Sequence, residues 1–499
     1  MKNIKKYILV LSATVVLSSC TYEFPEREEK TSGNADFTKM VSVGNSLTAG
    51  YMNGALYNDG QATSFPLLIA QQMKSVEKGA FIGDFNQPNI NSTHGYFGVV
   101  GTTILGRLRL VGTTPTPFVP GDMPTPYTGD KSSLNNFGVP GITLLTAMIP
   151  LTGGPASPAN PAYNPLYERF ASNPSVSTIL GDAAAALEDG GTFFTFWLGS
   201  NDVLGYAAGG ASNPAILTSA ADFEGRYNTA LGIILAANAG ASGAVANIPN
   251  VTDLPYFTIV PWNPLPLDAA TATGTNAAFD DPATGYNPGL GAALALGIID
   301  QAEYDKRKVV FSEGQNGFLI EDSELTTADI SAAFGYPPGS VVLPNYRLTN
   351  ATDLIPLPAA GVLGTEAVPG DPRTTRGVGV PLEDSHVVTA AEQKEISESV
   401  SSFNNTIKTA VDSNSDRLVL VDANLIFSNL TANGATINGS GLDASFIPPF
   451  GAFSVDGVHP NSRGNAYIAN RFIEAINYKF GSGIPLLNPN DYAGNTLPE

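Results

Sequence analysis

From residue 37 onward, short β-prone runs ending in glycine or asparagine alternate with longer segments of helical spacing. This alternation is typical of α/β folds built on a parallel sheet. It predicts strands over residues 38–43, 133–137, 192–198, 244–248 and 418–422. Strands separated by helices in this way suit one doubly wound sheet, so we expect a single α/β domain over residues 37–480.

The clearest predicted helix covers residues 390–411. Its apolar residues fall 4, 3, 4 and 3 positions apart, which places them on one helical face: Ile396, Val400, Phe403, Ile407 and Ala410. A further helix is expected over about 462–478, after the last predicted strand. These two helices would precede and follow the last predicted strand, which continues the alternation of strands and helices along the chain.

Two stretches, about 51–129 and 261–384, do not follow that rhythm. They contribute many of the 52 glycines and 37 prolines of the 499 residues, and each holds one expected helix, at 65–76 and about 298–309. Long irregular loops are uncommon inside compact domains unless they have a function. We therefore expect both stretches to be insertions that decorate the sheet.

The first twenty residues, MKNIKKYILVLSATVVLSSC, contain three lysines, an apolar run over residues 7–17 and a terminal cysteine. Eleven residues cannot span about 30 Å of hydrocarbon, so residues 1–19 are expected to be a signal peptide. Their ending resembles the lipobox of bacterial lipoproteins. That resemblance implies cleavage before Cys20, lipid modification of its thiol and membrane anchoring in the cell envelope, most simply at the outer membrane. An ordinary secretory signal with an incidental cysteine is the alternative.

Residues 20–36 are acidic and polar and are expected to be a flexible tether, and residues 481–499 are expected to form a C-terminal tail. The net charge of −20, from 25 basic and 45 acidic residues, leaves no basic surplus for phosphate backbones. Nucleic acid is therefore excluded as an expected partner. Because Cys20 is the only cysteine, lipidation would leave no thiol for disulfides, metal ligation or nucleophilic catalysis.

No metal or cofactor is expected. Residues 412–416 begin like a calcium loop, but Arg417 and Ala423 occupy the places where glycine and glutamate are needed. His386 beside Glu383 and Asp384 makes only a fragment of a metal site, and a solvated acidic turn is the simpler interpretation.

Four short blocks carry candidate chemistry, and the first is VGNSLTAG at residues 43–50. It follows the first predicted strand and places Ser46 at the carboxyl end of that strand, where open α/β sheets bind ligands. An ordinary helix cap is the alternative for this serine.

The second and third blocks are NFGVPGIT at residues 136–143 and FWLGSND at residues 196–202. The backbone N–H of Gly141 and the side-chain amide of Asn201 could both donate hydrogen bonds to an oxyanion at the same sheet edge. A tight turn at Gly141 and an Asx turn at Asn201 are the alternatives.

The fourth block is DGVHPN at residues 456–461. A carboxylate three residues before an imidazole can accept Nδ1–H and leave Nε2 free as a base. The other histidines, His94 and His386, lie in or beside the expected insertions, so His459 is the best candidate base. The alternative is a capping Asp456 with a bystander histidine.

Together, in this order, the four blocks resemble those of the SGNH (GDSL-type) serine hydrolases, a family of esterases and lipases. The resemblance covers about 37–50, 130–260 and 385–480 and implies a flavodoxin-like three-layer α/β/α fold with a five-stranded parallel sheet. It implies that Ser46 is the nucleophile, that Asp456 and His459 complete a triad, and that Ser46, Gly141 and Asn201 form the oxyanion hole. Asn45 replaces the aspartate usual in the family, which should keep the turn but remove a charge.

The expected function is therefore a lipid-anchored esterase or lipase that cleaves carboxylic esters through an acyl-enzyme. The substrate could be an acylated glycan, a lipid or a small ester. The alternative is a non-catalytic surface lipoprotein that uses the same fold to bind glycans or lipids through its insertions.

Overall fold

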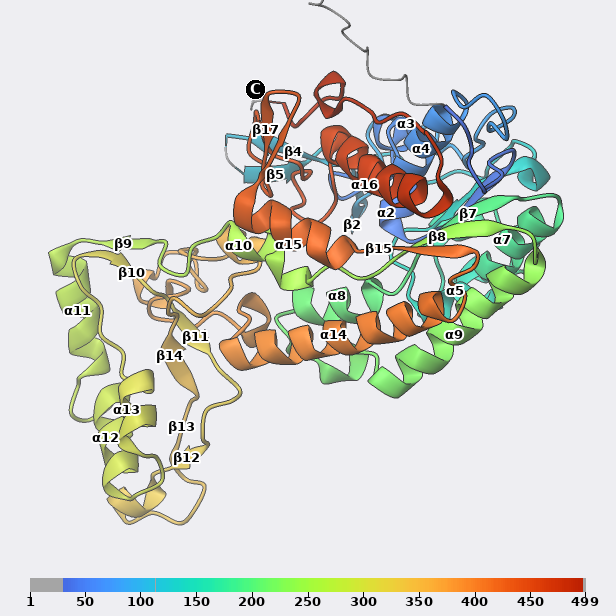
Figure 1. The fold of residues 1–499 in the computed structure, drawn as a ribbon. Coiled ribbons are helices and arrows are strands. Elements are labelled where there is room, and N and C mark those ends of the chain that lie inside the picture. Colours follow the sequence, from blue (N-terminus) through green and yellow to red (C-terminus); the bar gives the residue numbers. More distant parts are fainter. Residues whose placement is uncertain (1–29, 113, 497–499) are drawn as a thin grey trace, which may run out of the picture.

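A computed structural model describes residues 30–112 and 114–496 of the chain. Its centre is a five-stranded sheet in which all neighbouring strands run parallel, in the order β15-β8-β7-β1-β6 (Figure 1). The strands are β1 (Met40–Gly44), β6 (Asn136–Gly138), β7 (Phe193–Trp197), β8 (Ser242–Ala246) and β15 (Leu418–Val421). The predicted parallel sheet is confirmed. In chain order the strands lie 2-1-3-4-5, one of the two common orders of doubly wound sheets.

Strand β7 shows why this sheet is covered on both sides. All five of its residues are buried, and they alternate in direction. The Phe193 ring contacts Phe480 on one face at 5.8 Å, whereas Phe196 contacts Tyr227 on the other at 5.7 Å. Such strands read as continuous apolar runs because helices pack on both faces.

Helices pack against both faces of the sheet, an arrangement compatible with a three-layer α/β/α fold (Figure 1). One face carries α4 (Phe65–Met73), α15 (Ala423–Asn433) and α16 (Ser462–Phe480). The opposite face carries α5 (Leu144–Met148), α7 (Ile179–Glu188), α9 (Ala220–Ala237) and α14 (Ala390–Asp412). The two clearest predicted helices correspond to α14 and α16, with ends within two residues of those expected.

The stretch 51–129 divides into two parts of different character. Helix α4 belongs to the layered core, since the Phe65 ring stacks on Phe472 of α16 with centroids 4.8 Å apart. The rest decorates the core with a short helix and two hairpins: α3 (Asn58–Ala62), β2 (Gly98–Val100), β3 (Thr103–Leu105), β4 (Leu108–Val111) and β5 (Thr114–Pro117). Only this second part is a decoration of the kind expected.

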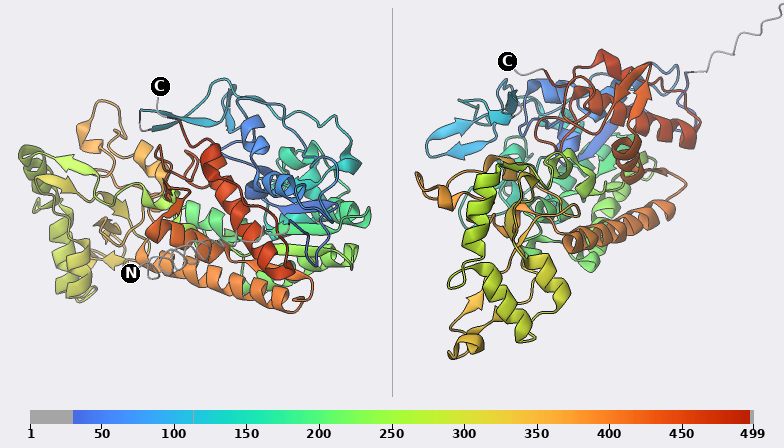
Figure 2. Two further views of the ribbon diagram at one scale, coloured as in Figure 1. Left: turned by 45° about the horizontal axis from the view of Figure 1, so that its top comes forward. Right: turned by 90° about the vertical axis from the view of Figure 1, so that its left-hand side faces the viewer.

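The stretch 261–384 forms a body with its own hydrophobic core, which protrudes from the layered part (Figures 1 and 2). We call it the insertion body. The irregular loop expected from its glycines, alanines and prolines is replaced by regular elements, because buried residues such as Leu290, Val309 and Ile330 give these elements a shared core. These elements are β9 (Leu265–Leu267), α11 (Ala269–Phe279), α12 (Tyr286–Ala295), α13 (Gln301–Arg307), β10 (Gly314–Asn316), β11 (Leu319–Glu321), β12 (Ala328–Asp329), β13 (Val342–Leu343) and β14 (Tyr346–Leu348).

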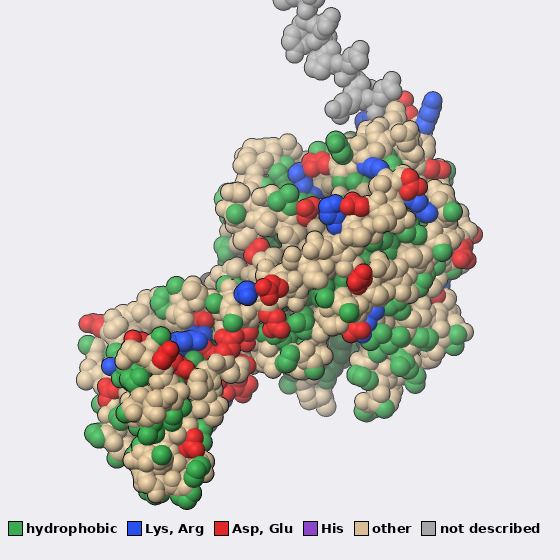
Figure 3. Space-filling model, turned by 60° about the horizontal axis from the view of Figure 1, so that its bottom comes forward, with side chains coloured by type: hydrophobic (Ala, Val, Ile, Leu, Met, Phe, Trp, Pro, Cys, Tyr) green, Lys and Arg blue, Asp and Glu red, His purple; other side chains and the backbone are tan. Residues whose placement is uncertain are grey.

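Acidic side chains gather where the insertion body meets the layered part (Figure 3). Glu392 in the first turn of α14 forms a capping box with Thr389, in which each side chain bonds the backbone of the other. Burial raises the pKa of the Glu392 carboxyl to about 7, with further contributions from Asp384 and Glu324. The junction is thus acidic and partly desolvated.

Both chain ends of the described part pack against the domain. Residues 30–36, expected to belong to a flexible tether, donate and accept backbone hydrogen bonds; for example, Asn34 N–H bonds the Phe480 carbonyl at 2.8 Å. Residues 481–496 follow α16 closely, and Asn470 bonds both backbone groups of Leu487. Cys20 and the expected signal peptide lie outside the described residues. Among residues 30–112 and 114–496, every helix is too short or too polar to cross a membrane.

Candidate active site

Ser46 lies where β1 ends and the short helix α2 (Ser46–Ala49) begins. Asn45 caps this turn, with its side-chain oxygen accepting the Leu47 N–H at 3.0 Å, so the amide holds the turn as expected. Helix α2 lies close over the end of β6: a Cβ on Gly138 would come within 2.4 Å of the Ala49 nitrogen. These contacts fix Ser46 at the carboxyl edge of the sheet, with 7% of the residue exposed.

His459 bridges Ser46 and Asp456. Its Nε2 lies 2.8 Å from Ser46 Oγ, and its Nδ1 lies 3.0 Å from Asp456 Oδ2. Burial alone would raise the pKa of the Asp456 carboxyl, but His459 and backbone hydrogen bonds hold it below its usual value. An ionised carboxylate only accepts hydrogen bonds, so Nδ1 carries the proton of the neutral ring and Nε2 accepts the Ser46 hydroxyl.

The Asp456 carboxylate is itself held from two directions. Its Oδ1 accepts the backbone N–H groups of Val458 and His459, each at 2.9 Å. Its Oδ2 accepts the N–H of Gly54 at 2.7 Å, from the segment that follows α2. The Tyr51 ring packs on the imidazole with centroids 4.8 Å apart. The orientation of His459 is therefore set by residues from both ends of the domain.

Gly141 and Asn201 lie at the ends of β6 and β7, beside the strand that carries Ser46. Gly141 adopts φ +80°, a conformation that favours glycine, and its N–H makes no hydrogen bond within the described part of the chain. No atom outside its immediate neighbours would lie within 4 Å of a Cβ there, so the space beside it is open. Asn201 Nδ2 donates to the Ile142 carbonyl at 2.7 Å, which leaves the second amide hydrogen for a ligand.

Asp202 is a positioning residue that the sequence patterns did not single out. Its carboxylate is fully buried and accepts the Leu144 N–H and the Thr218 hydroxyl, each at 3.0 Å. Burial raises the pKa of Asp202 to about 6 despite these bonds. Asp202 thereby ties the segment after Gly141 to the segment of Asn201. Its place directly after Asn201 in the GSND run was the available signal.

The four predicted blocks thus meet at one edge of the sheet. In the observed order, β6 is added on one side of β1 and the later strands on the other, so the strand order reverses between β1 and β7, which is where doubly wound sheets form a ligand crevice. Ser46 follows β1 and Asn201 follows β7, so both flank this crevice. The arrangement supplies a hydroxyl in contact with a base, and hydrogen-bond donors close to it in the fold.

The other two histidines are not part of this arrangement. His94 stacks on Phe118 in the first decoration, and His386 lies in a 3₁₀ turn (Asp384–His386) at the acidic junction. Within the described ranges, no cluster of three or more His, Cys, Asp or Glu side chains could hold a metal ion.

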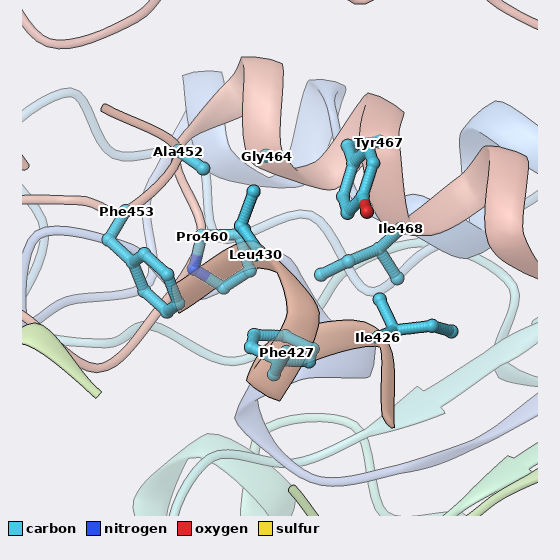
Figure 4. A pocket seen from close by; sticks show the side chains of 9 residues that line it. All are labelled: Ile426, Phe427, Leu430, Ala452, Phe453, Pro460, Gly464, Tyr467 and Ile468. Atoms are coloured by element: carbon cyan, nitrogen blue, oxygen red, sulfur yellow. The ribbon is translucent and has the colours of Figure 1, made fainter. Parts of the chain in front are cut away.

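A small cavity lies between α15 and α16, and Pro460, the residue after His459, is part of its lining (Figure 4). It is lined by apolar side chains such as Phe427, Leu430 and Ile468, and its volume is about 10 Å³. That is close to the minimum for one water molecule, so the cavity is too small to hold a substrate.

No protein-family model matches the chain, and a search of curated proteins finds no significant match. Function is therefore inferred from the geometry of the chain itself.

Proposed function

We propose that the protein is a serine esterase of the SGNH (GDSL-type) hydrolase family, with the flavodoxin-like fold of that family. One observation carries the proposal: His459 contacts Ser46 Oγ with one ring nitrogen and the Asp456 carboxylate with the other. A hydroxyl, an imidazole and a buried carboxylate in series are the arrangement that activates a serine nucleophile.

The reaction begins when Ser46 Oγ attacks the ester carbonyl carbon and His459 Nε2 takes the hydroxyl proton. The bond from this carbon to the alcohol oxygen then breaks, and His459 gives its proton to the departing alcohol. Water next attacks the acyl-Ser46 carbonyl while His459 takes its proton, and the Ser46 ester bond breaks as that proton returns to Oγ. The net change is ester plus water to carboxylic acid plus alcohol, with no cofactor.

The negative charge on the carbonyl oxygen is stabilised by the N–H groups of Ser46 and Gly141 and by the Asn201 amide. The unpaired N–H of Gly141 and the uncommitted hydrogen of Asn201 support this role. Donors already fixed in place stabilise the transition state because they need no reorganisation. Asp202 keeps two of these donors together without touching substrate.

The proposal extends to location and substrate class. Lipid on Cys20 would anchor the enzyme in the bacterial cell envelope, at the outer membrane, facing acylated glycans, lipids or small esters. Cys20→Ser should then release the protein from the membrane fraction. If this variant still sediments with membranes after a salt wash, another element is the anchor.

Hydrolysis of 4-nitrophenyl acetate by wild type, Ser46→Ala and a control Ser397→Ala tests the activity. Ser397 lies exposed on α14, so its loss should leave the rate unchanged. Ser46→Ala should lose the activity while keeping its melting temperature within a few degrees. Wild-type turnover by Ser46→Ala would refute the proposal.

A binding role is favoured by one separate observation. The insertion body holds an open groove of about 610 Å³, lined largely by apolar and aromatic side chains such as Phe279, Tyr286 and Tyr346. A groove of this size suits a ligand of moderate size. A folded protein that lacks esterase activity but binds ligand here would support the non-catalytic alternative.

A further inference from the structure

A second cleft lies beside the candidate active site. It has a volume of about 370 Å³ and lies between the β4 strand, the segment after α2 and residues 493–496. Its lining includes the cations Arg107 and Arg109 together with Asp59, Asn461 and Asn495. This cleft is charged and polar, in contrast to the groove of the insertion body.

Arg107 is held in this cleft by aromatic rings. Its guanidinium lies between Tyr57 and Phe118, 4.9 and 4.7 Å from their centroids. Arg109 lies 4.6 Å from the same Phe118 ring, so two cations are brought together by one ring. Stacking on rings is favourable for a guanidinium and fixes its plane.

The hydrogen-bond donors of Arg107 are largely uncommitted. Its Nε donates to the Thr93 carbonyl at 3.2 Å, and its two terminal nitrogens bond no acceptor in residues 30–112 or 114–496. A planar guanidinium with both terminal nitrogens available matches a carboxylate, which it can bind through two parallel hydrogen bonds. The cleft therefore offers a prepared site for an anionic group.

The remaining polar lining suits hydroxyl groups. The exposed Asp59 carboxylate can accept hydroxyl hydrogens, and so can Asn495 Oδ1, because Asn495 uses its Nδ2 on the Phe446 and Phe453 carbonyls. Asp59 would oppose a simple anion, but it favours a ligand that carries hydroxyls next to its acidic group. This combination is the chemistry of an acidic sugar.

The cleft shares a wall with the candidate active site. Asn53 lines the cleft, and its Nδ2 donates to the Tyr57 hydroxyl at 2.7 Å. The next residue, Gly54, donates its N–H to Asp456. A ligand in the cleft is thus separated from the Ser46–His459–Asp456 series by a single chain segment.

We infer that this cleft binds an acidic sugar of the substrate, with Arg107 recognising the carboxylate. The inference rests on the proposed esterase function and narrows its substrate class to acylated glycans that contain acidic sugars. Arg107 and its neighbours would hold the glycan while an ester on it reaches Ser46.

Binding can be measured without catalysis by titrating the Ser46→Ala protein calorimetrically. Trigalacturonate is the acidic probe, and the neutral galactotriose is its control. Trigalacturonate should bind, and its affinity should fall as salt is added because the contact is ionic. Galactotriose should bind at least about tenfold more weakly, the loss of about 1.4 kcal/mol expected when a charge-assisted contact is missing.

Two arginine variants in the same Ser46→Ala background locate the site. Arg107→Gln should weaken trigalacturonate binding at least about tenfold. Arg471→Gln removes the same charge from the surface of α16, where Arg471 pairs with Glu474, outside both the cleft and the groove of the insertion body, and should leave binding unchanged. Arg107→Lys keeps the charge but not the planar fork. This variant should therefore bind trigalacturonate more tightly than Arg107→Gln and more weakly than the protein with Arg107 intact.

Equal binding of the two trisaccharides, binding of neither, or equal effects of the two Gln variants would overturn the inference. A loss of folding is detected by the melting temperature, and Arg107→Lys then supplies the comparison. Because the titration uses Ser46→Ala, these outcomes are independent of whether the wild type hydrolyses esters. An active esterase without acidic-sugar binding would refute this inference alone.

Discussion

The backbone N–H of Gly54 donates to Oδ2 of Asp456 at 2.7 Å, the same carboxylate oxygen that lies 3.0 Å from His459 Nδ1. Gly54 and His459, more than 400 positions apart in the sequence, thus both contact the same carboxylate oxygen of the candidate active site. Gly54 adopts φ +71°, and a Cβ there would come within 2.8 Å of the Phe97 ring. The segment after α2 is therefore part of the site, although it lies in a stretch expected to be an insertion.

Gly54→Ala should lower kcat by about tenfold or more. The left-handed conformation costs a non-glycine residue about 1–2 kcal/mol, and the clash with Phe97 should displace the N–H from Asp456. Steady-state kinetics on a chromogenic ester measures the effect. The matched control is Gly101→Ala, which has a similar φ of +62° but open space for its Cβ. Equal kcat values for the two variants would show that the contact with Asp456 is unimportant.

The rate should rise from acidic to neutral pH, because general-base catalysis at the serine hydroxyl requires a neutral imidazole. Asp456 stays ionised throughout, since His459 and backbone N–H groups outweigh burial and keep its pKa below the usual value. Burial and Asp456 raise the pKa of Tyr51 above its usual range, so Tyr51 adds no falling limb. The measurement is kcat/KM against pH. A rate independent of pH over this range would contradict His459 as the base.

The contribution of Asp202 to the free energy of unfolding should fall as pH rises from about 4 to 6. Burial raises its pKa from 3.8 to about 6, so the folded state holds a proton that the unfolded state has lost. This stabilisation, about 3 kcal/mol, is fully present below the pKa of Asp202 in the unfolded state. It is lost as the pH rises through the pKa of Asp202 in the folded state. Urea unfolding of wild type and Asp202→Asn at several pH values tests this. A stability difference between the two proteins that does not change with pH would contradict it.

Parts of this structure were predictable because they follow local patterns. Strand β7 and helix α14 have continuous or periodic apolar residues that determine their type directly. From the sequence alone, a contact between Ser46 and His459 is only a hypothesis, because it depends on the strand order. The strand expected at 133–137 forms only at Asn136–Gly138, preceded by a 3₁₀ turn (Lys131–Ser133), since side-chain caps such as Asp130 favour the turn.

Long-range packing could not be read from the chain. Helix α4 lies between glycine-rich stretches, and only its contact with α16 assigns it to the core. The insertion body depends on the buried Arg347, which bonds Asp322 and Asp353 from other segments. The GSND run alone does not predict the positioning role of Asp202, because that role depends on the bond with Leu144 from another loop.

Replacing residues 261–384 by a short Gly/Ser linker should leave hydrolysis of an acetyl ester intact, because Ser46, His459 and the oxyanion donors lie outside this stretch. The KM for larger acyl groups should rise, since the groove of the insertion body is removed. Gly274→Phe is the matched variant: Gly274 lines the groove and has open space for a side chain, so the phenyl ring fills the groove without a deletion. A substrate profile unchanged in both folded variants would show that the insertion body takes no part in selecting substrates.

Covalent labelling with a fluorophosphonate, followed by intact mass and peptide mapping, tests directly whether Ser46 is the activated nucleophile. One adduct per chain should form on Ser46, and it should be absent from Ser46→Ala and form much more slowly in His459→Ala. These results follow because the reagent requires a hydroxyl activated by a neighbouring base. Folded wild-type protein that takes up no label, or carries the label on another residue, would show that Ser46 is not the nucleophile.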